Sequence, residues 1–169
     1  MPECAAYLFN LGSTRLLGLI PDKNFEGKRK IVVRFEGKAS VYDVRRKEFL
    51  GSEDRFEATI EPAVPRLFAM VAGPVRGIET ASAGAKDRGD EISMEFRVLA
   101  GPGLRSVAKV EVFDPSGKSA AHYGRNVDVV DGHGRFSFRT ALNDIAGVWK
   151  VVVTDVLSGR KATVEAVVR

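Results

Sequence analysis

The sequence is poor in the residues and segments that mark several common classes of protein. Its 169 residues include one cysteine, Cys4, so the chain can form neither an internal disulfide nor a site with several thiolate ligands. No uninterrupted apolar stretch approaches the roughly 20 residues that a membrane-spanning helix needs. The first 20 residues lack the basic start and continuous apolar segment of a signal peptide. We therefore expect no membrane insertion, and any leader of an exported parent protein to lie elsewhere.

Concentrated positive charge is also missing, although the net charge is +4. Residues 1–72 contain 12 basic and 10 acidic side chains and the remainder 14 and 12, so each half carries only +2. Nucleic-acid-binding proteins usually gather their charge on one surface. The densest basic runs, at residues 28–30 and 45–47, flank expected strands and are typical of solvated strand ends. We expect no nucleic-acid partner.

The last 23 residues show the clearest structural pattern in the chain. An apolar run with Trp149 is followed by a turn at residues 157–159 and by a second run in which apolar and polar residues alternate from Ala162 to Val168. This pattern predicts a β-hairpin. Trp149 is in step with Val151 and Val153, so we expect the indole ring in an apolar layer that a second sheet covers.

The first half of the chain reads as short strands divided by turns. We expect two strands around Gly12 within residues 5–20, then strands at residues 31–35, 40–44, 49–50, 56–60 and 66–71. Turns are predicted at residues 37–38, 46–47 and 51–54, where glycine and charged residues interrupt the apolar pattern. No convincing helix is found. Such short, evenly spaced strands are typical of an antiparallel sandwich or barrel.

The composition changes between residues 72 and 90, which are rich in glycine, alanine and charge. We interpret this stretch as a hinge that leads into a second domain, with a first strand at residues 75–81. About seven strands follow in roughly 95 residues, among them a weak strand at residues 120–123, which is the size of an immunoglobulin-like sandwich. The predicted fold class is therefore all-β, with two tandem antiparallel β-sandwich domains at residues 1–73 and 74–169, the second immunoglobulin-like.

Two resemblances extend this interpretation. Residues 110–168 resemble bacterial immunoglobulin-like and macroglobulin-like modules, whose recurring elements here are Asp114–Gly117, Asn143–Trp149 and Asp155–Gly159. Residues 1–73 resemble the all-β domain that follows the catalytic barrel in some bacterial glycoside hydrolases. The residues that match its pattern are Tyr42, Asp43, Val44, Gly51, Pro65 and Phe68. The resemblances imply a noncatalytic part of a carbohydrate-active enzyme, but such modules accompany many activities.

Candidate catalytic residues are few. Glycosidic hydrolysis needs two carboxyl groups roughly 5–9.5 Å apart across a cleft. The carboxylates of Asp43, Asp54, Glu57 and Glu61 are close in sequence, but they occupy alternating or turn positions that are typical of a solvated sheet face. The chain has two histidines, His122 and His133, and no G-x-S-x-G motif. Since the resemblance places the catalytic carboxylates in a barrel that this chain lacks, we expect no catalytic residue and no enzyme activity.

Metal and phosphate sites have little support. Asp128, Asp131 and His133 form the only candidate metal cluster, but an Asp-Gly pair more often serves a turn. The Gly101–Gly103 segment follows a strand and does not lead into a helix, so it is not a phosphate-binding loop. We expect no metal and no cofactor.

Sugar binding needs exposed aromatic rings, and the sequence offers four candidate side chains. Trp149 and Tyr42 share faces with valines and are expected to be buried; Tyr7 lies in the first strand. Tyr123 alone has a polar setting, so it is the single candidate ligand-binding residue. The leading hypothesis is a structural or protein-interacting accessory region of a larger exported bacterial protein, extracellular or periplasmic, that contacts other domains of its parent chain or a protein partner. The alternative is a carbohydrate-binding module with a glycan as its ligand.

Overall fold

The computed structural model describes residues 4–81 and 83–169. All thirteen regular elements within these residues are β-strands, which confirms the all-β prediction. They form two sheets, of five and eight strands. The two-residue strand Ala85–Lys86 pairs in parallel with the last strand, and the other described pairings are antiparallel. The described residues contain no helix long and apolar enough to cross a membrane.

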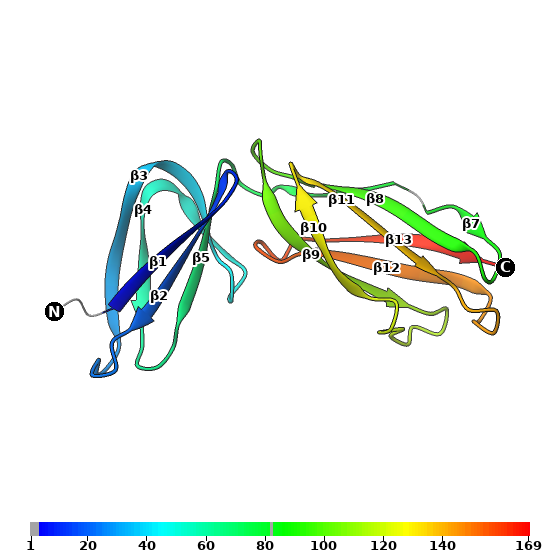
Figure 1. The fold of residues 1–169 in the computed structure, drawn as a ribbon, viewed down its shortest axis with the longest axis horizontal. Helices are drawn as coiled ribbons and strands as arrows, with labels where there is room; N and C mark the ends of the chain where they lie inside the picture. The colour runs from blue at the N-terminus through cyan, green and yellow to red at the C-terminus, as the bar shows by residue number, and fades with distance from the viewer. Residues whose placement is uncertain (1–3, 82) are drawn as a thin grey trace. The chain divides into compact units, whose positions relative to one another are not determined.

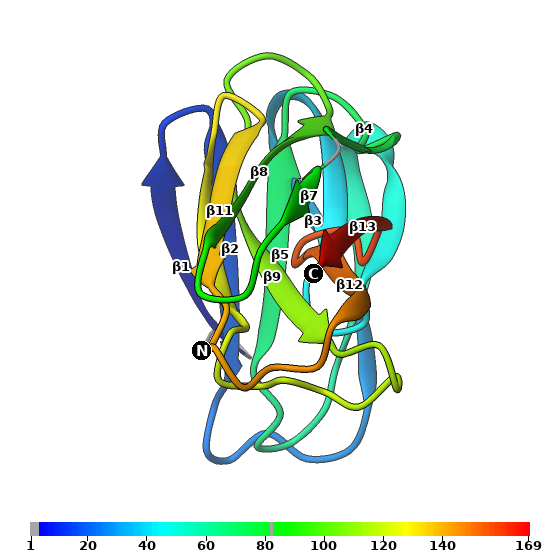
Figure 2. The same ribbon diagram turned by 90° about the vertical axis from the view of Figure 1, so that its right-hand side faces the viewer.

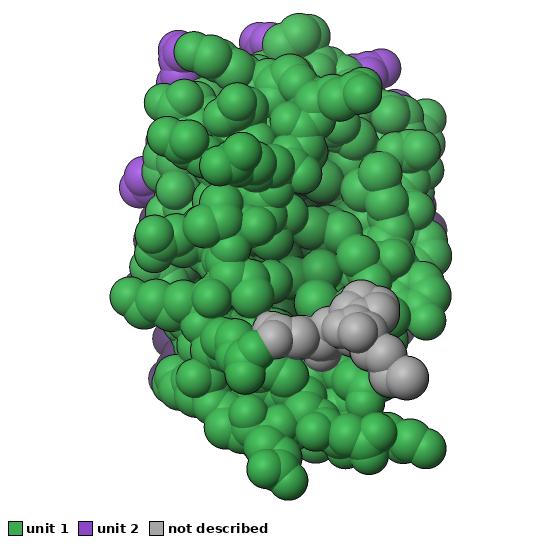
Figure 3. Space-filling model, turned by 90° about the vertical axis from the view of Figure 1, so that its left-hand side faces the viewer, with its two compact units in different colours: residues 1–74, 100–105 green, residues 75–99, 106–169 purple. Residues whose placement is uncertain are grey.

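The strands belong to two compact units, coloured separately in Figure 3. Unit 1 consists of Met1–Pro74 and Ala100–Arg105, and unit 2 of Val75–Leu99 and Ser106–Arg169. The sequence divides the chain after residue 73, and the contacts divide it after residue 74. The six residues 100–105 group with unit 1, although the sequence places them in the second domain.

Unit 1 contains one five-stranded antiparallel sheet, drawn from blue to green in Figure 1. Its order is β1-β2-β5-β3-β4, so β1 and β4 are the edge strands. The strands are β1 (Cys4–Leu11), β2 (Thr14–Pro21), β3 (Arg29–Asp43), β4 (Glu48–Ile60) and β5 (Arg66–Val71). The two-residue turn between β1 and β2 lies at Gly12, as the sequence predicts, and Gly12 has φ +59°.

Two turns predicted in unit 1 are wrong. The residues at 37–38 and 51–54 lie within β3 and β4, which run through these positions as single strands of 15 and 13 residues. The pairing of β3 with β4 shifts register between Arg34 and Ala39 and again after Val41. Gly37, at φ +76°, and Gly51, at φ +125°, accommodate the bend that such irregularities cause. The glycines therefore bend the strands and do not end them.

The bend lets the sheet of unit 1 enclose its own core, as the curvature of β3 and β4 in Figure 1 shows. Core residues come from all three inner strands and from both ends of the long hairpin, and they are Leu17, Leu19, Ala39, Val41, Phe56, Ala58, Phe68 and Met70. The rings of Phe56 and Phe68 meet with their centroids 4.7 Å apart. Alternating residues on β3 supply partly buried side chains from the other end of the strand, including Ile31 and Phe35.

Unit 2 contains the eight-stranded sheet, in the order β6-β8-β11-β10-β9-β12-β13-β7. Its strands are β6 (Gly77–Thr80), β7 (Ala85–Lys86), β8 (Glu91–Leu99), β9 (Arg105–Phe113), β10 (Arg125–Val130), β11 (His133–Arg139), β12 (Gly147–Asp155) and β13 (Lys161–Val168). Figure 2 looks along this unit and shows β8 and β11 on one side and β12 and β13 on the other. The sheet thus folds into two layers around a core, as in a β-sandwich.

The core of unit 2 follows from strict alternation. Every second residue of β8 is buried, from Ile92 to Val98, and so are Val151 and Val153 of β12. Trp149 is 2% exposed, so the prediction of a buried indole is confirmed. The hairpin of β12 and β13 pairs Gly147 with Val168 and Thr154 with Lys161, which confirms the pattern at the end of the chain.

The weak strand predicted at residues 120–123 is wrong. Tyr123 N–H donates to the carbonyl of Ala120, and Gly124 N–H to that of Ala121, so this segment is a pair of tight turns. The neighbouring strand is β10, which starts at Arg125. Turn geometry places the side chain of Tyr123 beside the core and not in a sheet ladder.

Candidate functional site

Tyr123, the candidate ligand-binding residue, is partly buried in an aromatic cluster. Its ring centroid lies 4.9 Å from that of Phe138 and 6.0 Å from that of Trp149. Its hydroxyl donates to Oδ2 of Asp144 at 2.7 Å and accepts from the Ala141 N–H at 3.0 Å. Burial, and then the hydrogen bond to Asp144, raise the pKa of the phenol above its ordinary value. The ring and hydroxyl thus have structural contacts, and the setting is less polar than the sequence suggests.

The other aromatic candidates for sugar stacking are divided by burial. Trp149 donates its indole N–H to the carbonyl of Ile145 at 2.9 Å, and Tyr42 is 3% exposed. Both are buried, as the sequence predicts. Tyr7 is 49% exposed, on the edge strand of unit 1. The described aromatic rings of unit 2 therefore offer Tyr123, with the adjacent His122, as the one partly open pair, and their centroids are 4.0 Å apart.

The acidic cluster at residues 128–133 forms a hairpin. Val130 pairs with His133 across a two-residue turn in which Asp131 and Gly132 have φ +51° and +81°. Both residues therefore occupy the left-handed region, as a type I′ turn requires. Throughout residues 4–81 and 83–169, no group of three His, Cys, Asp or Glu side chains could hold a metal ion. The Asp-Gly pair is explained by the turn.

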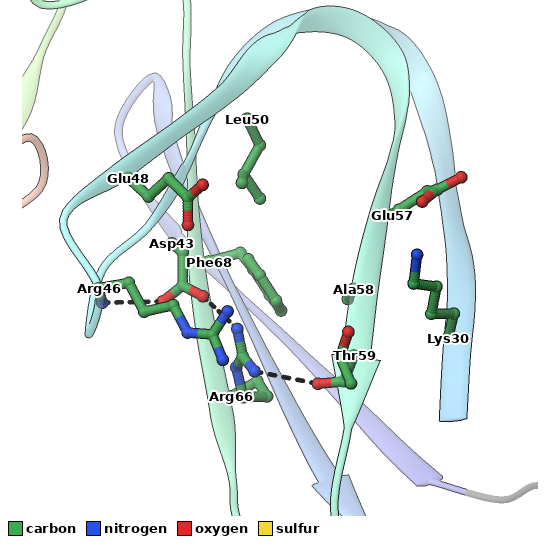
Figure 4. A pocket seen from close by; sticks show the side chains of 10 residues that line it. All are labelled: Lys30, Asp43, Arg46, Glu48, Leu50, Glu57, Ala58, Thr59, Arg66 and Phe68. Carbon is green, nitrogen blue, oxygen red and sulfur yellow. Dashed lines mark hydrogen bonds and ion pairs between the residues drawn. The ribbon is translucent and has the colours of Figure 1, made fainter. Parts of the chain in front are cut away.

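Asp43 is a buried carboxylate with a structural environment. Its side chain is 2% exposed and pairs with Arg66, which is 7% exposed. Asp43 also accepts from the Arg46 N–H at 3.1 Å, and Arg66 donates to the Thr59 carbonyl at 3.0 Å. These bonds connect β3, β4 and β5 at one end of the core (Figure 4). Asp43 is held by partners of the same unit. It is therefore a buried ion-pair partner and not one of the two carboxyl groups across a cleft that glycosidic hydrolysis needs.

The hollow beside this ion pair has a volume of about 210 Å³. Figure 4 shows Glu48 and Glu57 on different sides of it, with Leu50 and Phe68 between them. Its charged lining consists of three basic and three acidic side chains: Lys30, Arg46, Arg66, Asp43, Glu48 and Glu57. Small-molecule pockets usually measure about 300–1,000 Å³. A smaller hollow with balanced charge has no preference for an anion or a cation, so we assign it no ligand.

The open edge of β1 is the most unusual surface of unit 1. β1 pairs with β2 on one side, and no other described strand pairs with its outer side. Its seven residues from Ala5 to Leu11 are all exposed. Four of them are large and apolar, with exposed fractions of 49% for Tyr7, 55% for Leu8, 58% for Phe9 and 47% for Leu11. Since β1 carries no charged residue, nothing in it prevents another strand from pairing.

The exposed side chains of β1 lie on both faces of the sheet. Leu8 pairs with Leu17, a core residue, so Leu8 is on the core face. Tyr7 pairs with Gly18 on the outer face, the same face as Phe9 and Leu11. A ligand on one face would leave the other face open, whereas a further strand in the same sheet would flank both. The geometry therefore fits addition of a strand.

The opposite edge of unit 1 differs in charge. β4 also pairs on one side, with β3, but it carries five charged residues among 13: Glu48, Glu53, Asp54, Arg55 and Glu57. Charged side chains and bulges at an edge discourage pairing with a second chain. The contrast is not evident from the sequence pattern, in which β1 resembles any other apolar strand. The absence of charge from residue 4 to residue 11 was the available signal.

These observations define an all-β protein of the β-sandwich type, with one uncharged open edge strand and with its buried ion pair in a structural position. The sequence matches no known protein-family model and none of the curated proteins. The two resemblances thus stay predictions.

Proposed function

We propose that the chain is a noncatalytic accessory region of a larger exported bacterial protein and that it acts in structural support or protein interaction. The observation that carries this proposal is the open edge of β1, an uncharged strand with four exposed large apolar side chains. Extended partners bind such edges by adding a strand, with main-chain hydrogen bonds supplying affinity. An extracellular or periplasmic location belongs to the same proposal.

The residues that carry the resemblance to the glycoside-hydrolase-associated domain support a structural role. Tyr42 and Phe68 are 3% and 0% exposed, and Asp43 is in the buried ion pair. Gly51 adopts a positive φ within β4. Each position supports packing or backbone geometry, and none presents a reactive group in an open cleft. A pattern of such residues fits an accessory domain better than a catalytic one.

The strand arrangement of unit 2 supports an immunoglobulin-like module. Its order contains two runs, β6-β8-β11-β10 and β9-β12-β13. With the short β7 left out and the other strands numbered along the chain, these runs have the same strand orders as the two sheets of the immunoglobulin fold. The short β7 pairs in parallel with β13 through Ala85 and Val167. Trp149 lies in the core on β12, whereas antibody domains carry their core tryptophan on an earlier strand.

The proposal is tested by measuring whether the edge of β1 accepts a strand. A fluorescent peptide that alternates valine and threonine, with terminal lysines for solubility, is titrated with the full chain while anisotropy is recorded. We expect saturable binding that Leu8→Lys weakens and that Phe49→Lys, on the charged edge, leaves within twofold. Equal binding to wild type and both variants, or no binding, would count against an interaction role for this edge.

The glycan alternative has one observation in its favour, the partly open pair of Tyr123 and His122. A glycan array probed with wild type and with Tyr123→Ala separates the two functions. Binding that the substitution removes, while His122→Ala weakens it, would favour a carbohydrate-binding module. A silent array is the result expected for the accessory role.

A further inference from the structure

We propose that the open edge of β1 binds the same edge of a second copy of this chain, so that two five-stranded sheets join into one across a two-fold axis. This inference rests on the proposed interaction role and names its partner. Alternate residues of an edge strand direct their N–H and C=O groups outward, and an antiparallel neighbour can satisfy them. The strand available for that pairing runs from Cys4 to Leu11.

Self-pairing is favoured first by the lack of charge. In an isologous antiparallel pair the central residue faces its own copy, and every other residue i faces a residue j of the same strand. A charge at the centre of β1 would therefore face a like charge, and a charge elsewhere would face an uncharged residue of the partner strand. The segment CAAYLFNL has none. An antiparallel pair with Leu8 opposite its own copy also places Tyr7 opposite the second copy's Phe9, twice, since these residues are neighbours on either side of Leu8. Aromatic pairs of this kind stabilise cross-strand contacts.

Side-chain size gives a second argument for this alignment. Centred on Leu8, the pairing sets Ala5 opposite Leu11 and Ala6 opposite Asn10, so small residues meet larger ones on both faces. Leu8 and Tyr7 lie on opposite faces of the sheet, and both faces gain contacts at once. The two halves of β1 are thus complementary to each other when the strand is reversed.

The opposite edge explains why the assembly would close at two copies. If β1 added to the β4 edge of the next molecule, the contact would be head-to-tail and could continue into a filament. That contact would set apolar side chains of β1 against an edge that carries Glu53, Arg55 and Glu57. Pairing of β1 with β1 avoids these charges and leaves two β4 edges at the ends of the joined sheet. The expected product is a dimer.

The exposed area indicates how strong the dimer should be. Each large side chain of β1 is about half exposed, so four such side chains with roughly 150–200 Å² each offer at most about 400 Å² per chain. The large side chains of two chains thus contribute at most about 800 Å² of the roughly 1,200 Å² at which stable interfaces start. We therefore expect a reversible dimer with a dissociation constant between about 1 µM and 1 mM.

The test uses sedimentation velocity on the full chain at protein concentrations that span this range. Wild type should shift from monomer to dimer with concentration. Leu8→Lys sets two ammonium groups opposite each other, and Leu8→Glu two carboxylates, so each variant alone should raise the dissociation constant by at least about tenfold. An equimolar mixture should restore dimers, because the charges are then opposite. Phe49→Lys, a change on the other edge, should dimerise like wild type.

The possible outcomes separate the dimer from the broader proposal. A wild type that stays monomeric at the highest concentration overturns the dimer, as does a dimer that neither Leu8 variant weakens, which would use another surface. The valine–threonine peptide is then titrated with the same samples. If wild type is monomeric but binds the peptide, the interaction role is supported and self-pairing is excluded. If wild type neither dimerises nor binds the peptide, both proposals fail. Restoration by the mixture also guards against misfolding, since unfolded variants could not rescue each other.

Discussion

The two units end their sheets in different ways. Unit 2 has short edge strands, β6 with four residues and β7 with two, and short edges offer little to a pairing strand. Unit 1 ends in two long strands, of 8 and 13 residues, and protects only β4 with charge. Their interiors differ as well, since unit 2 is centred on a ring cluster around Trp149 and unit 1 contains a buried ion pair. Unit 2 thus has no long unprotected edge strand among its described residues, whereas unit 1 has one in β1.

The largest expected effect lies in the ring cluster of unit 2. Trp149→Ala removes a buried indole that contacts Tyr123 and Phe138, and core substitutions of this size cost about 3–5 kcal/mol in the free energy of unfolding. Hydrogen exchange of the unit 2 strands measures the loss. Trp149→Phe, which keeps a ring but not the hydrogen bond to Ile145, should cost much less. An alanine variant as stable as wild type would show that the cluster does not hold unit 2 together.

The buried ion pair of unit 1 should have a nearly comparable effect. Asp43→Ala leaves Arg66 buried without its carboxylate, which should cost about 3 kcal/mol in the free energy of unfolding of unit 1. Hydrogen exchange of β3 and β5 is the measurement. The double change Asp43→Leu with Arg66→Met replaces the pair by apolar groups and should recover most of that loss. If the double variant were less stable than Asp43→Ala, the desolvation argument would fail.

The hydroxyl of Tyr123 is expected to contribute less. Tyr123→Phe removes its hydrogen bonds to Asp144 and Ala141 and should cost about 1 kcal/mol in the stability of unit 2 at neutral pH. The measurement is chemical denaturation followed by the fluorescence of Trp149, the only tryptophan in the chain.

The same residue predicts a dependence on pH. Because the pKa of the Tyr123 phenol is raised in the folded protein, the unfolded chain loses this proton first as the pH rises. Its contribution to stability is therefore complete below about pH 10 and is lost as the pH rises through the folded-state pKa. Wild type should lose stability above pH 10 more steeply than Tyr123→Phe. Parallel profiles would contradict the raised pKa.

The smallest effect on stability is expected at the charged edge of unit 1. Replacing Glu53, Arg55 and Glu57 by threonine should change the free energy of unfolding by less than about 0.5 kcal/mol per site. The substitutions should nevertheless allow β4 to pair with a strand of another molecule, so light scattering should detect species larger than a dimer. Adding Leu8→Lys should block growth through β1. Unchanged association would mean that charge is not what protects this edge.

The parts of the fold that could be predicted are those with local patterns. The alternation around Trp149 and the Asp-Gly pair at residues 131–132 specify a strand face and a hairpin turn by themselves. Gly37 shows the limit, because a glycine among polar residues can end a strand or bend it. β3 is continuous through that position because the residues on both sides of it, 29–34 and 39–43, pair with β4.

The candidate site was less predictable, since it depends on which strands become neighbours. The apolar residues of β1 would suit a central strand as well as an edge, and the sheet order alone makes them exposed. The polar setting expected for Tyr123 was misleading for the same reason. Its partners Phe138 and Asp144 lie 15 and 21 residues further along the chain, and the fold brings them together.

The most direct test of the central claim is hydrogen exchange of the peptide that contains residues 4–11, measured by mass spectrometry at low and high protein concentration. If β1 pairs with β1, amides with outward N–H groups should exchange more slowly at high concentration, while the peptide from β4 should not change. Exchange in β1 that is fast at every concentration, or protection that also appears in β4, would contradict the account.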